Sequence, residues 1–342
     1  MRTEAKGKKN EAAVSRINGA ENASQTNHLI GILCVIIAAF GFSLMTFFVR
    51  QSGDLPTLQK AFFRNAFAAI IAIVSLIVTG RREKRRRGVS REQQPFDAEL
   101  SEKRYFIKPG CGKDIFFRCL FGTSGMIANF YAVDHLGIAD ANMLNKLSPF
   151  FAILLSIPIL KEKPTRLDWA SVLIAFLGSL LIIRPGSNLT PVPALLGLYG
   201  GFGAGTAYVF VRALGRKGER TSVIVLCFSL FSCAVTLPQL IFAFHPMTGQ
   251  QWLILCLAGI SAAIGQFGIT TAYKYAPAKD ISVFDYTQVI FAALLGILFL
   301  GETPVPLSIL GYIIIIGTAF FRWHIMRKDG HPENEKIETE KS

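Results

Sequence analysis

Apolar residues gather in long runs along the chain, separated by short polar or basic segments. A helix of about 20 apolar residues can cross a hydrocarbon core of ~30 Å, and it satisfies its own backbone polar groups there. The pattern therefore predicts an all-α polytopic membrane protein with ten transmembrane helices. The predicted spans cover residues 29–49, 59–79, 114–133, 139–160, 167–183, 194–213, 221–244, 252–273, 279–300 and 305–322.

One stretch of the chain, residues 122–183, occurs a second time at an offset of 140 residues and without a gap. A repeat at a fixed offset indicates two copies of one structural unit. We therefore predict a first five-helix repeat over residues 29–183 and a second over residues 194–322. The coinciding pairs are Gly125/Gly265, Ala132/Ala272, Asp140/Asp280, Phe151/Phe291, Glu162/Glu302 and Pro164/Pro304.

Three polar segments lie outside the predicted spans. Residues 1–28 are polar and mixed in charge, and residues 330–342 are rich in Glu and Lys, so we expect both segments to be disordered. The second of them belongs to a C-terminal tail that we expect over residues 323–342. The insert 81–113 is the longest loop and begins with the basic run 81–87. Such a run beside a membrane helix is attracted to anionic lipid headgroups by ~1 kcal/mol per basic residue. We favour the interpretation that this insert is a disordered loop that determines topology, and a specific lipid or regulatory site is the weaker alternative.

Charge sets the expected orientation. The formal net charge is +13, which in a soluble protein would suggest a nucleic-acid partner, but here the basic residues lie between apolar runs and we exclude that partner. A cytoplasmic N-terminus places 30 of the 36 Lys and Arg residues on the cytoplasmic side, as the positive-inside rule requires. We therefore expect both termini in the cytoplasm and the protein in the cell membrane.

The odd number of helices in each repeat has a structural consequence. Because each repeat has five helices, the second copy enters the membrane upside down. Inverted repeats of this kind are a common construction of secondary transporters, with the solute site near the midplane between the halves. No cofactor or metal site is indicated, since the six cysteines show no paired spacing.

Several motifs resemble the drug/metabolite transporter superfamily, and within it the EamA-type carriers of ten helices. They are Phe62–Arg64 early in the second span, Leu147–Phe151 and Leu160–Pro164 in the fourth, and Gln288–Phe291 and Leu300–Pro304 in the ninth. Val289 departs from the pattern, because the repeat would place a proline there to match Pro149. The resemblance implies a central cavity lined by spans one to four and six to nine, and transport of small metabolites in either direction.

Lys146 and Asp285 are charged residues inside predicted spans, where each ionisable group is costly and suggests a functional site. In the repeat register Lys146 matches Tyr286 and Asp285 matches Asn145, so the two charges lie on opposite sides of the midplane. Their Cα atoms differ by roughly 10 Å in depth, and a direct ion pair needs an extended lysine. Two interpretations carry equal weight: the residues bracket a solute, or they form a structural pair between helices four and nine.

In the solute interpretation, Lys146 binds a carboxylate or phosphate, and Asp285 binds an amine or a coupling proton. Arg64 either has a functional or gating role or extends to the headgroups, with equal weight, whereas we expect Arg118 to extend to the nearer membrane surface. The sequence does not show which face of each helix points to the cavity. Some further polar candidates are therefore expected to line the cavity, and others to join helices by hydrogen bonds. These candidates are Asn129, Tyr131, Asn142, Asn145, Tyr208, Gln266, Tyr286 and Gln288.

Glu162 and Glu302 end the fourth and ninth spans, where a carboxylate opposes the helix dipole. We expect each of them to accept hydrogen bonds from the start of the next helix, after Pro164 and Pro304, as a structural clamp. A gating role is the weaker alternative. With Pro149, these residues form the predicted framework set.

Two small-residue motifs need separate interpretations. Gly197, Gly201 and Gly205 form a small-xxx-small ridge, which predicts close helix packing within the bundle or at a homodimer interface. The segment 122–125 resembles the nucleophile motif of intramembrane rhomboid proteases. That chemistry needs a buried base near the serine, and all five histidines lie at helix ends or in tails. An intramembrane enzyme is therefore the weakest of our interpretations, and we assign no catalytic residue.

Together these patterns predict a secondary transporter, not an enzyme, working by alternating access. The expected solute is a small polar or zwitterionic, amino-acid-like metabolite, with proton coupling through Asp285 as one option. The alternative is an exporter of cationic or amphipathic drugs, which would be favoured if Lys146 were dispensable and Asp285 essential.

Overall fold

Among the described residues, helices joined by turns and loops are the regular secondary structure. The computed structural model describes residues 2–91, 106–136, 144–183, 191–301 and 306–329. The elements are α1 (Arg2–Gln51), α2 (Thr57–Arg91), α3 (Gly112–Leu136), α5 (Ser148–Leu160), α6 (Arg166–Ile183), α7 (Pro191–Arg216), α8 (Thr221–Phe242), α9 (Gly249–Tyr275), α10 (Ala278–Ile281), the 3-10 helix η1 (Ser282–Tyr286), α11 (Thr287–Leu300) and α12 (Pro306–Asp329).

Each of the ten predicted spans falls on a helical part of the described chain, and the ninth is formed by α10, η1 and α11 in succession. Seven of these segments are by themselves long and apolar enough to cross a membrane. The predicted all-α polytopic fold is thereby confirmed. For α3, α5 and α6, the crossing stays a prediction, and of the fourth span only residues 144–160 are described.

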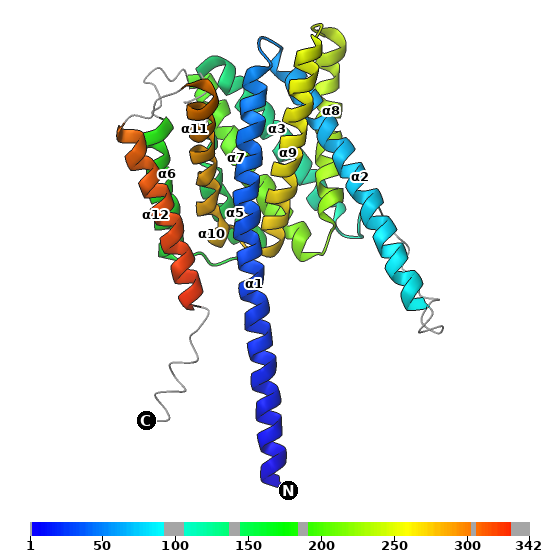
Figure 1. The fold of residues 1–342 in the computed structure, drawn as a ribbon, viewed down its shortest axis with the longest axis vertical. Helices are drawn as coiled ribbons and strands as arrows, with labels where there is room; N and C mark the ends of the chain where they lie inside the picture. Colours follow the sequence, from blue (N-terminus) through cyan, green and yellow to red (C-terminus); the bar gives the residue numbers. More distant parts are fainter. Residues whose placement is uncertain (1, 92–105, 137–143, 184–190, 302–305, 330–342) are drawn as a thin grey trace.

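The helices form one bundle with two distinct ends (Figure 1). We call the end where α1 enters the bundle and α12 leaves it the basal end. The opposite end, with the turn at residues 52–56 and the loop at residues 243–248, is the distal end. The first helix of the first half runs from the basal to the distal end, and α7, the first helix of the second half, runs the other way. The two halves are therefore inverted, as the repeat predicts.

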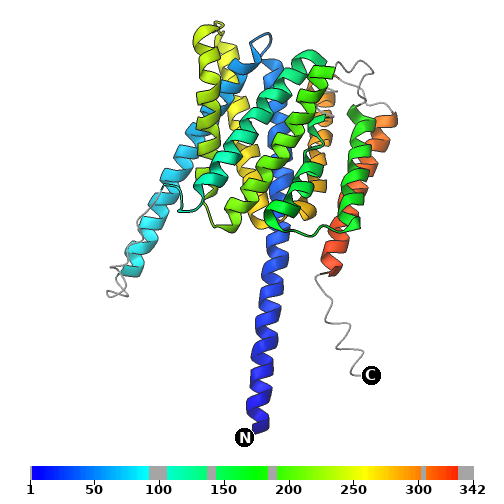
Figure 2. The same cartoon turned by 180° about the vertical axis from the view of Figure 1, so that it is seen from behind.

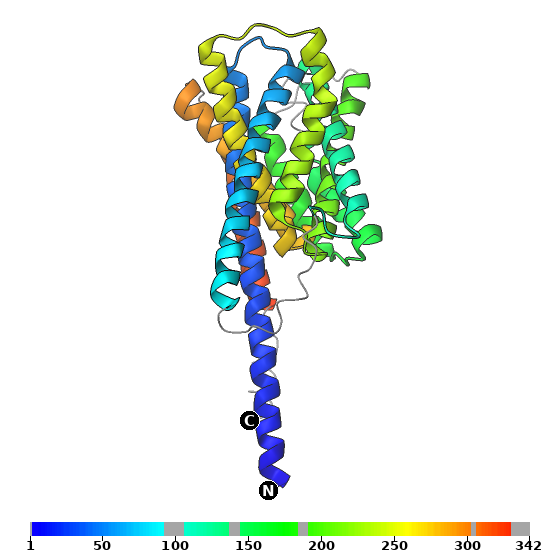
Figure 3. The same ribbon diagram turned by 90° about the vertical axis from the view of Figure 1, so that its right-hand side faces the viewer.

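Helix packing repeats this inversion. α3 packs along α7 and α9 along α1, while α5 packs on α7 and α11 on α1. If every helix is replaced by its equivalent in the other half, the α3–α7 contact becomes the α9–α1 contact, and the α5–α7 contact becomes the α11–α1 contact. The α2–α8 and α6–α12 contacts map onto themselves, and Figure 2 shows α6 and α12 side by side at one edge of the bundle. In Figure 3, α1, α2 and α9 lie on one side of the bundle and α3 and α7 on the other.

Matched residues of the repeat make matched contacts. The Phe151 ring packs edge-on against Phe202 of α7 at 5.6 Å, and Phe291 packs against Phe40 of α1 at 5.4 Å. The C-terminal caps of α5 and α11 also correspond, since Lys161 and Gly301 have φ angles of 57° and 67°. A left-handed backbone costs little in glycine but is strained in lysine, so the first copy keeps the turn despite its residue type.

The glycine ridge of α7 faces α5. A Cβ atom on Gly201 would lie 2.7 Å from the backbone oxygen of Leu144, and one on Gly205 would lie 2.7 Å from that of Ser148. Gly197 is similarly close to the Leu144 side chain. Close packing within the bundle is therefore confirmed, and a homodimer would have to use another surface.

The N-terminal tail differs from the prediction. α1 begins at Arg2, so residues 2–28, expected to be disordered, continue the first span as one helix. α12 extends to Asp329, and residues 330–342, the second segment expected to be disordered, lie outside the described residues. The start of the chain contains alanine, glutamate and lysine but no proline, and helix growth from an existing span avoids the cost of nucleation.

The basic insert is also partly helical. α2 continues to Arg91, so the basic run 81–87, expected in a disordered loop, belongs to a helix that projects beyond the basal end (Figure 1).

At the basal end, Lys217 donates a hydrogen bond to Asp114 at 2.6 Å, and this bond raises the pKa of Lys217. The contact ties the turn after α7 to the start of α3.

Candidate functional site

The fourth and ninth spans are both interrupted where their charged residues lie. Lys146 occupies a turn directly before α5, which opens with Ser148 and Pro149. Asp285 lies in the 3-10 helix η1, between α10 and α11. Because proline lacks a backbone N–H and favours the first turn of a helix, Pro149 explains the first interruption. Discontinuous helices of this kind commonly form solute sites in inverted-repeat carriers.

Lys146 and Asp285 form a buried ion pair. Lys146 Nζ lies 3.1 Å from Asp285 Oδ2 and 3.3 Å from the Asp285 backbone oxygen. Only 6% of Lys146 and 8% of Asp285 is exposed, so solvent screens the attraction little. Lys146 and Asp285, whose Cα atoms the sequence places at different depths in the membrane, therefore contact each other directly through their side chains.

Two neighbouring residues, Gln288 and Tyr286, form further hydrogen bonds with Lys146. Gln288 Oε1 accepts a third hydrogen bond from Lys146 Nζ at 2.7 Å. The fully buried Tyr286 hydroxyl donates to the Lys146 backbone oxygen at 2.9 Å. Tyr286 therefore joins the two interrupted spans, whereas Gln288 shares the lysine charge. Ser43 of α1 contacts the Gln288 backbone oxygen at 2.9 Å and attaches α1 to this group.

The other predicted polar candidates lie in different parts of the bundle. Asn145 directly precedes Lys146 and is half-buried, and Asn129 Oδ1 is buried on α3 with no hydrogen-bond partner among the described residues. Tyr131 is 40% exposed and stacks on His135 with ring centroids 3.9 Å apart, so it does not join the interior group. Asn142 lies outside the described residues.

Arg64 and Gln266 make their contacts away from the ion pair. Arg64 is only 6% exposed and contacts the sulfur atoms of Met45 and Met126 at 3.2 and 3.0 Å. Gln266 accepts a hydrogen bond from Arg118 at 3.0 Å. The prediction that Arg118 extends to the membrane surface is wrong, because its side chain is 3% exposed and packs against Phe228. A glycine one turn on, Gly122, leaves the space that lets this side chain run along α3.

Glu162 has partners other than those expected. Arg216 of α7 donates to Glu162 Oε1 at 2.6 Å and to the Leu160 backbone oxygen at 2.7 Å. Arg212 Nε lies 3.6 Å from the same carboxylate oxygen. The structural clamp therefore joins α5 to α7 and not to the helix that follows Pro164. Glu302 and Pro304, the second-copy partners, lie outside the described residues.

The start of the following helix is capped by another acid. Asp168 Oδ2 accepts hydrogen bonds from the backbone N–H of Thr165 at 2.6 Å and from its hydroxyl at 2.8 Å. Asp168 also binds Arg322 of α12 at 2.6 Å. The backbone donors that the sequence assigned to Glu162 are therefore partly satisfied by Asp168.

The substitution Glu162→Gln is expected to destabilise the bundle by about 2 kcal/mol, because it leaves the partly buried Arg212 and Arg216 without their carboxylate. The folded fraction should transport at the normal rate, since the clamp lies at the basal end. Thermal unfolding of the purified protein and the initial transport rate per folded molecule measure the two effects. Asp54→Asn, an exposed acid at the distal end, is the matched control, and normal stability with lost transport would favour gating instead.

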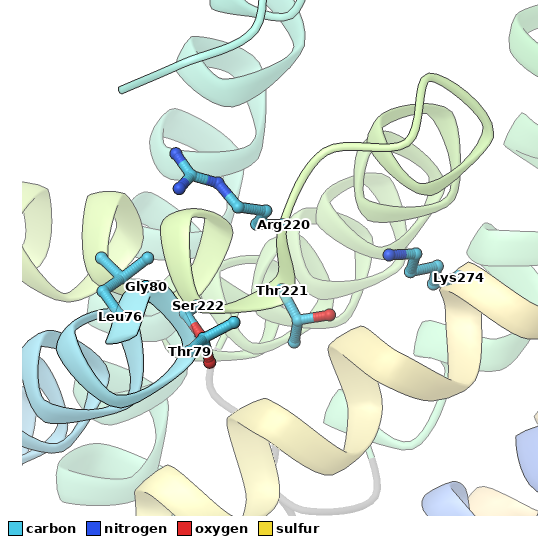
Figure 4. Close-up of a pocket in the computed structure, with 7 residues that line it drawn as sticks. All are labelled: Leu76, Thr79, Gly80, Arg220, Thr221, Ser222 and Lys274. Atoms are coloured by element: carbon cyan, nitrogen blue, oxygen red, sulfur yellow. The ribbon is translucent and has the colours of Figure 1, made fainter. Parts of the chain in front are cut away.

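A cavity of about 190 Å³ lies at the basal end between α2, α8 and α9 (Figure 4). The Lys274 amine points toward Thr221, whereas the guanidinium of Arg220 turns away and donates to the Phe106 backbone oxygen at 2.9 Å. The cavity is separate from the Lys146–Asp285 pair. Its other lining residues are Leu76, Thr79, Gly80 and Ser222.

The rhomboid-like motif has no catalytic surroundings in the described part of the chain. The Ser124 hydroxyl lies 2.9 Å from the Tyr199 hydroxyl and 3.5 Å from the Phe121 backbone oxygen. Its hydrogen bonds join α3 to α7. Within the described ranges there is also no group of three or more His, Cys, Asp or Glu residues that could hold a metal.

An inverted helical bundle with a buried charge pair at two interrupted helices defines the class of polytopic membrane transporters. The chain matches the EamA-like transporter family over residues 29–184 and 192–322, and it belongs to that family. It is a transporter of the drug/metabolite superfamily, as its motifs predict, and not an enzyme.

Known proteins agree with this assignment. The pseudopaline exporter CntI of Pseudomonas aeruginosa is 30% identical over 84% of this chain and 93% of its own length. The human solute carrier family 35 member G1 is 24% identical over 86% of this chain and 80% of its own length. A solved crystal structure shares the fold with a TM-score of 0.67 at 19% identity, over 86% of this chain and 95% of that one.

Proposed function

We propose that this transporter is a secondary carrier for a small polar or zwitterionic, amino-acid-like metabolite, and that it works by alternating access. The observation that carries the proposal is the Lys146–Asp285 pair. It lies where the fourth and ninth spans, equivalent helices of the two inverted halves, are both interrupted. A zwitterion can replace both partners at once, with its carboxylate on Lys146 and its amine on Asp285.

The pair also supplies a gate between two states. In the closed state Lys146 binds Asp285 and Gln288, as described above. Opening of the pair exposes one positive and one negative charge. A bound solute pairs with both charges, and this binding offsets the free-energy cost of separating Lys146 from Asp285. Protonation of Asp285 would release Lys146 in the same way, which supports proton coupling as a second route. The name of the pseudopaline exporter, given to a relative, supports export as the direction.

Charge at the basal end supports a cytoplasmic location for both termini. The positive-inside rule favours the side with the basic run of α2, and that side also holds the start of α1 and the end of α12 (Figure 1). Anionic lipid headgroups would bind the basic segment 81–91, at ~1 kcal/mol per basic residue. The neighbouring cavity, with Lys274 and three hydroxyl-bearing residues, fits a phosphate group at the same level.

Flux through proteoliposomes of the purified protein tests this function. We expect saturable counterflow of at least one member of a panel of radiolabelled zwitterionic amino acids, accelerated by a proton gradient if Asp285 is the coupling group. Vesicles with and without an anionic lipid test the headgroup contact, which predicts faster flux with the anionic lipid. Flux that is unsaturable would indicate a channel, and flux of only a quaternary ammonium drug would favour the drug exporter.

A further inference from the structure

Two buried arginines in the interior lack the acidic partners that other buried cations have. Lys146 binds Asp285 at 3.1 Å, and Arg322 binds Asp168 at 2.6 Å. By contrast, among the residues described, neither Arg64 nor Arg118 has a carboxylate oxygen within 4.0 Å. An uncompensated charge inside a membrane bundle is costly, so these two arginines need an explanation.

The contacts of Arg64 are weak. Its guanidinium reaches two methionine sulfur atoms, at 3.2 and 3.0 Å, and the Asn65 side-chain oxygen at 3.4 Å. Thioether sulfur is a poor hydrogen-bond acceptor, and a 3.4 Å contact is long for a charged donor. Its Nε atom is buried and finds no hydrogen-bond partner in the part of the chain that the structure describes.

Arg118 is held in a comparable way. Within the described residues its hydrogen bond goes to Gln266 Oε1 at 3.0 Å, and its guanidinium lies 4.1 Å above the Phe228 ring. Its Nε is also buried and has no hydrogen-bond partner among those residues. A guanidinium has five N–H donors, so each arginine keeps donors that a neutral amide and a ring cannot satisfy.

The two charges share one face of α3. Arg118, Gly122, Met126 and Phe130 are spaced four residues apart and therefore follow one stripe of the helix. Arg118 extends along the stripe, because a Cβ atom on Gly122 would collide with its Nη1 atom. Arg64 reaches the same stripe from α2 at Met126 and faces the Phe130 ring at 5.9 Å. Gly122, beside the Arg118 guanidinium, and Met126, which Arg64 contacts, are successive positions of the stripe and differ by ~6 Å in height.

We propose that Arg64 and Arg118 form one site for an oxyanion, a carboxylate or phosphate group of the transported solute, with the Asn65 and Gln266 amides beside it. This inference rests on the proposed carrier function and adds that the solute bears an anionic group besides the one that Lys146 binds. Planar guanidinium groups bind carboxylates and phosphates through paired hydrogen bonds.

Anion-dependent stability of the purified full-length protein tests the site without requiring transport. Citrate and inorganic phosphate serve as probes, with potassium chloride at equal ionic strength as the screening control. We expect the probes to raise the melting temperature of the wild type above that in chloride. Arg64→Gln and Arg118→Gln should each weaken the apparent affinity for the probe by about 10- to 100-fold, the range for a charge-assisted hydrogen bond.

A second readout separates a binding role from a structural one. Without the probes, both arginine variants should melt at or above the wild-type temperature, because an uncompensated buried charge has been removed. Arg166→Gln removes the same charge from an exposed position at the start of α6, and it should respond to the probes as the wild type does. Lower stability of both arginine variants, with an unchanged response to the probes, would overturn the proposal.

Competition in the flux assay identifies the anion as part of the solute. Citrate or phosphate should inhibit counterflow in the wild type and lose that effect in both arginine variants. Stabilisation without inhibition would show binding of a free inorganic or organic anion only, and no stabilisation of the wild type by either probe would show that there is no site. Either result would overturn this inference while leaving the carrier function intact, whereas absence of saturable flux would contradict the carrier itself.

Discussion

Lys146→Met and Asp285→Asn, made singly, are each expected to abolish transport and to lower the yield of folded protein. Removing one partner leaves the other as an uncompensated buried charge, which costs about 3–5 kcal/mol. The measurement is the counterflow rate per folded molecule, together with the melting temperature of the purified variant. Lys163→Met removes a lysine that is exposed beyond the end of α5 and is the control; it should behave as the wild type.

The double variant Lys146→Met/Asp285→Leu separates a functional pair from a structural one. Replacing both charges with apolar groups of similar size is often neutral or stabilising, so folding and thermal stability should return to near the wild-type level. Transport should stay at least 100-fold below the wild type, because neither the solute charges nor a proton has a binding partner. Recovery of transport in the double variant would show that the pair only holds the fourth and ninth spans together.

Gly205→Leu is expected to prevent assembly of the bundle. A Cβ atom on Gly205 would already lie 2.7 Å from the Ser148 backbone oxygen and from the Phe151 Cβ, and 2.9 Å from the Ala152 backbone nitrogen. These are backbone and near-backbone atoms, which cannot rotate out of the way, so α5 and α7 must separate. The smaller change Gly205→Ala should cost about 1–3 kcal/mol, the usual cost of overpacking. Folded yield in membranes and the melting temperature measure the two effects.

A second glycine provides the matched control for this experiment. Gly317 lies within α12, and a Cβ atom there would have no neighbour within 4 Å. Gly317→Leu should therefore fold normally, and Gly317→Ala should be neutral or slightly stabilising, because alanine favours the helix. Equal damage from leucine at both positions would contradict the packing argument, since the effect would then come from loss of glycine itself.

Where sequence-based expectations failed, the missing information was the rotation of one helix against another. Arg118 was expected at the membrane surface because of its position near a helix end, but its side chain faces Gln266 and Phe228 in the interior. Glu162 was expected to cap the next helix, but two arginines of α7 bind it instead. The arginines that bind Glu162 follow it by 50 and 54 residues and Gln266 follows Arg118 by 148 residues, so none of these neighbours leaves a local signal in the chain.

One clue to Arg118 was present in the chain itself. Gly122 follows it by four residues, on the same face of the helix. A glycine at that spacing from a long side chain leaves room for it to lie along the helix, but other glycines of the bundle serve helix contacts instead. Only the surrounding helices distinguish these two uses.

The sequence by itself determined the class of the protein and its internal symmetry. Apolar runs long enough to cross a membrane define the helices, because lipid leaves no other way to satisfy the backbone. The repeat at an offset of 140 residues, with five helices in each copy, requires the inversion that the packing shows. These properties depend on period, length and count, which are visible along a single chain.

Only the tertiary structure decided which polar groups meet. The sequence left open whether Lys146 and Asp285 were far apart or paired, and the folded chain brings them within 3.1 Å at two interrupted helices. It also leaves Arg64 and Arg118 without an acid on the described part of the bundle, which no count of charges reveals. The physical reason is that partner choice depends on helical phase and on contacts between helices distant in the chain, and these arise only when the halves pack together.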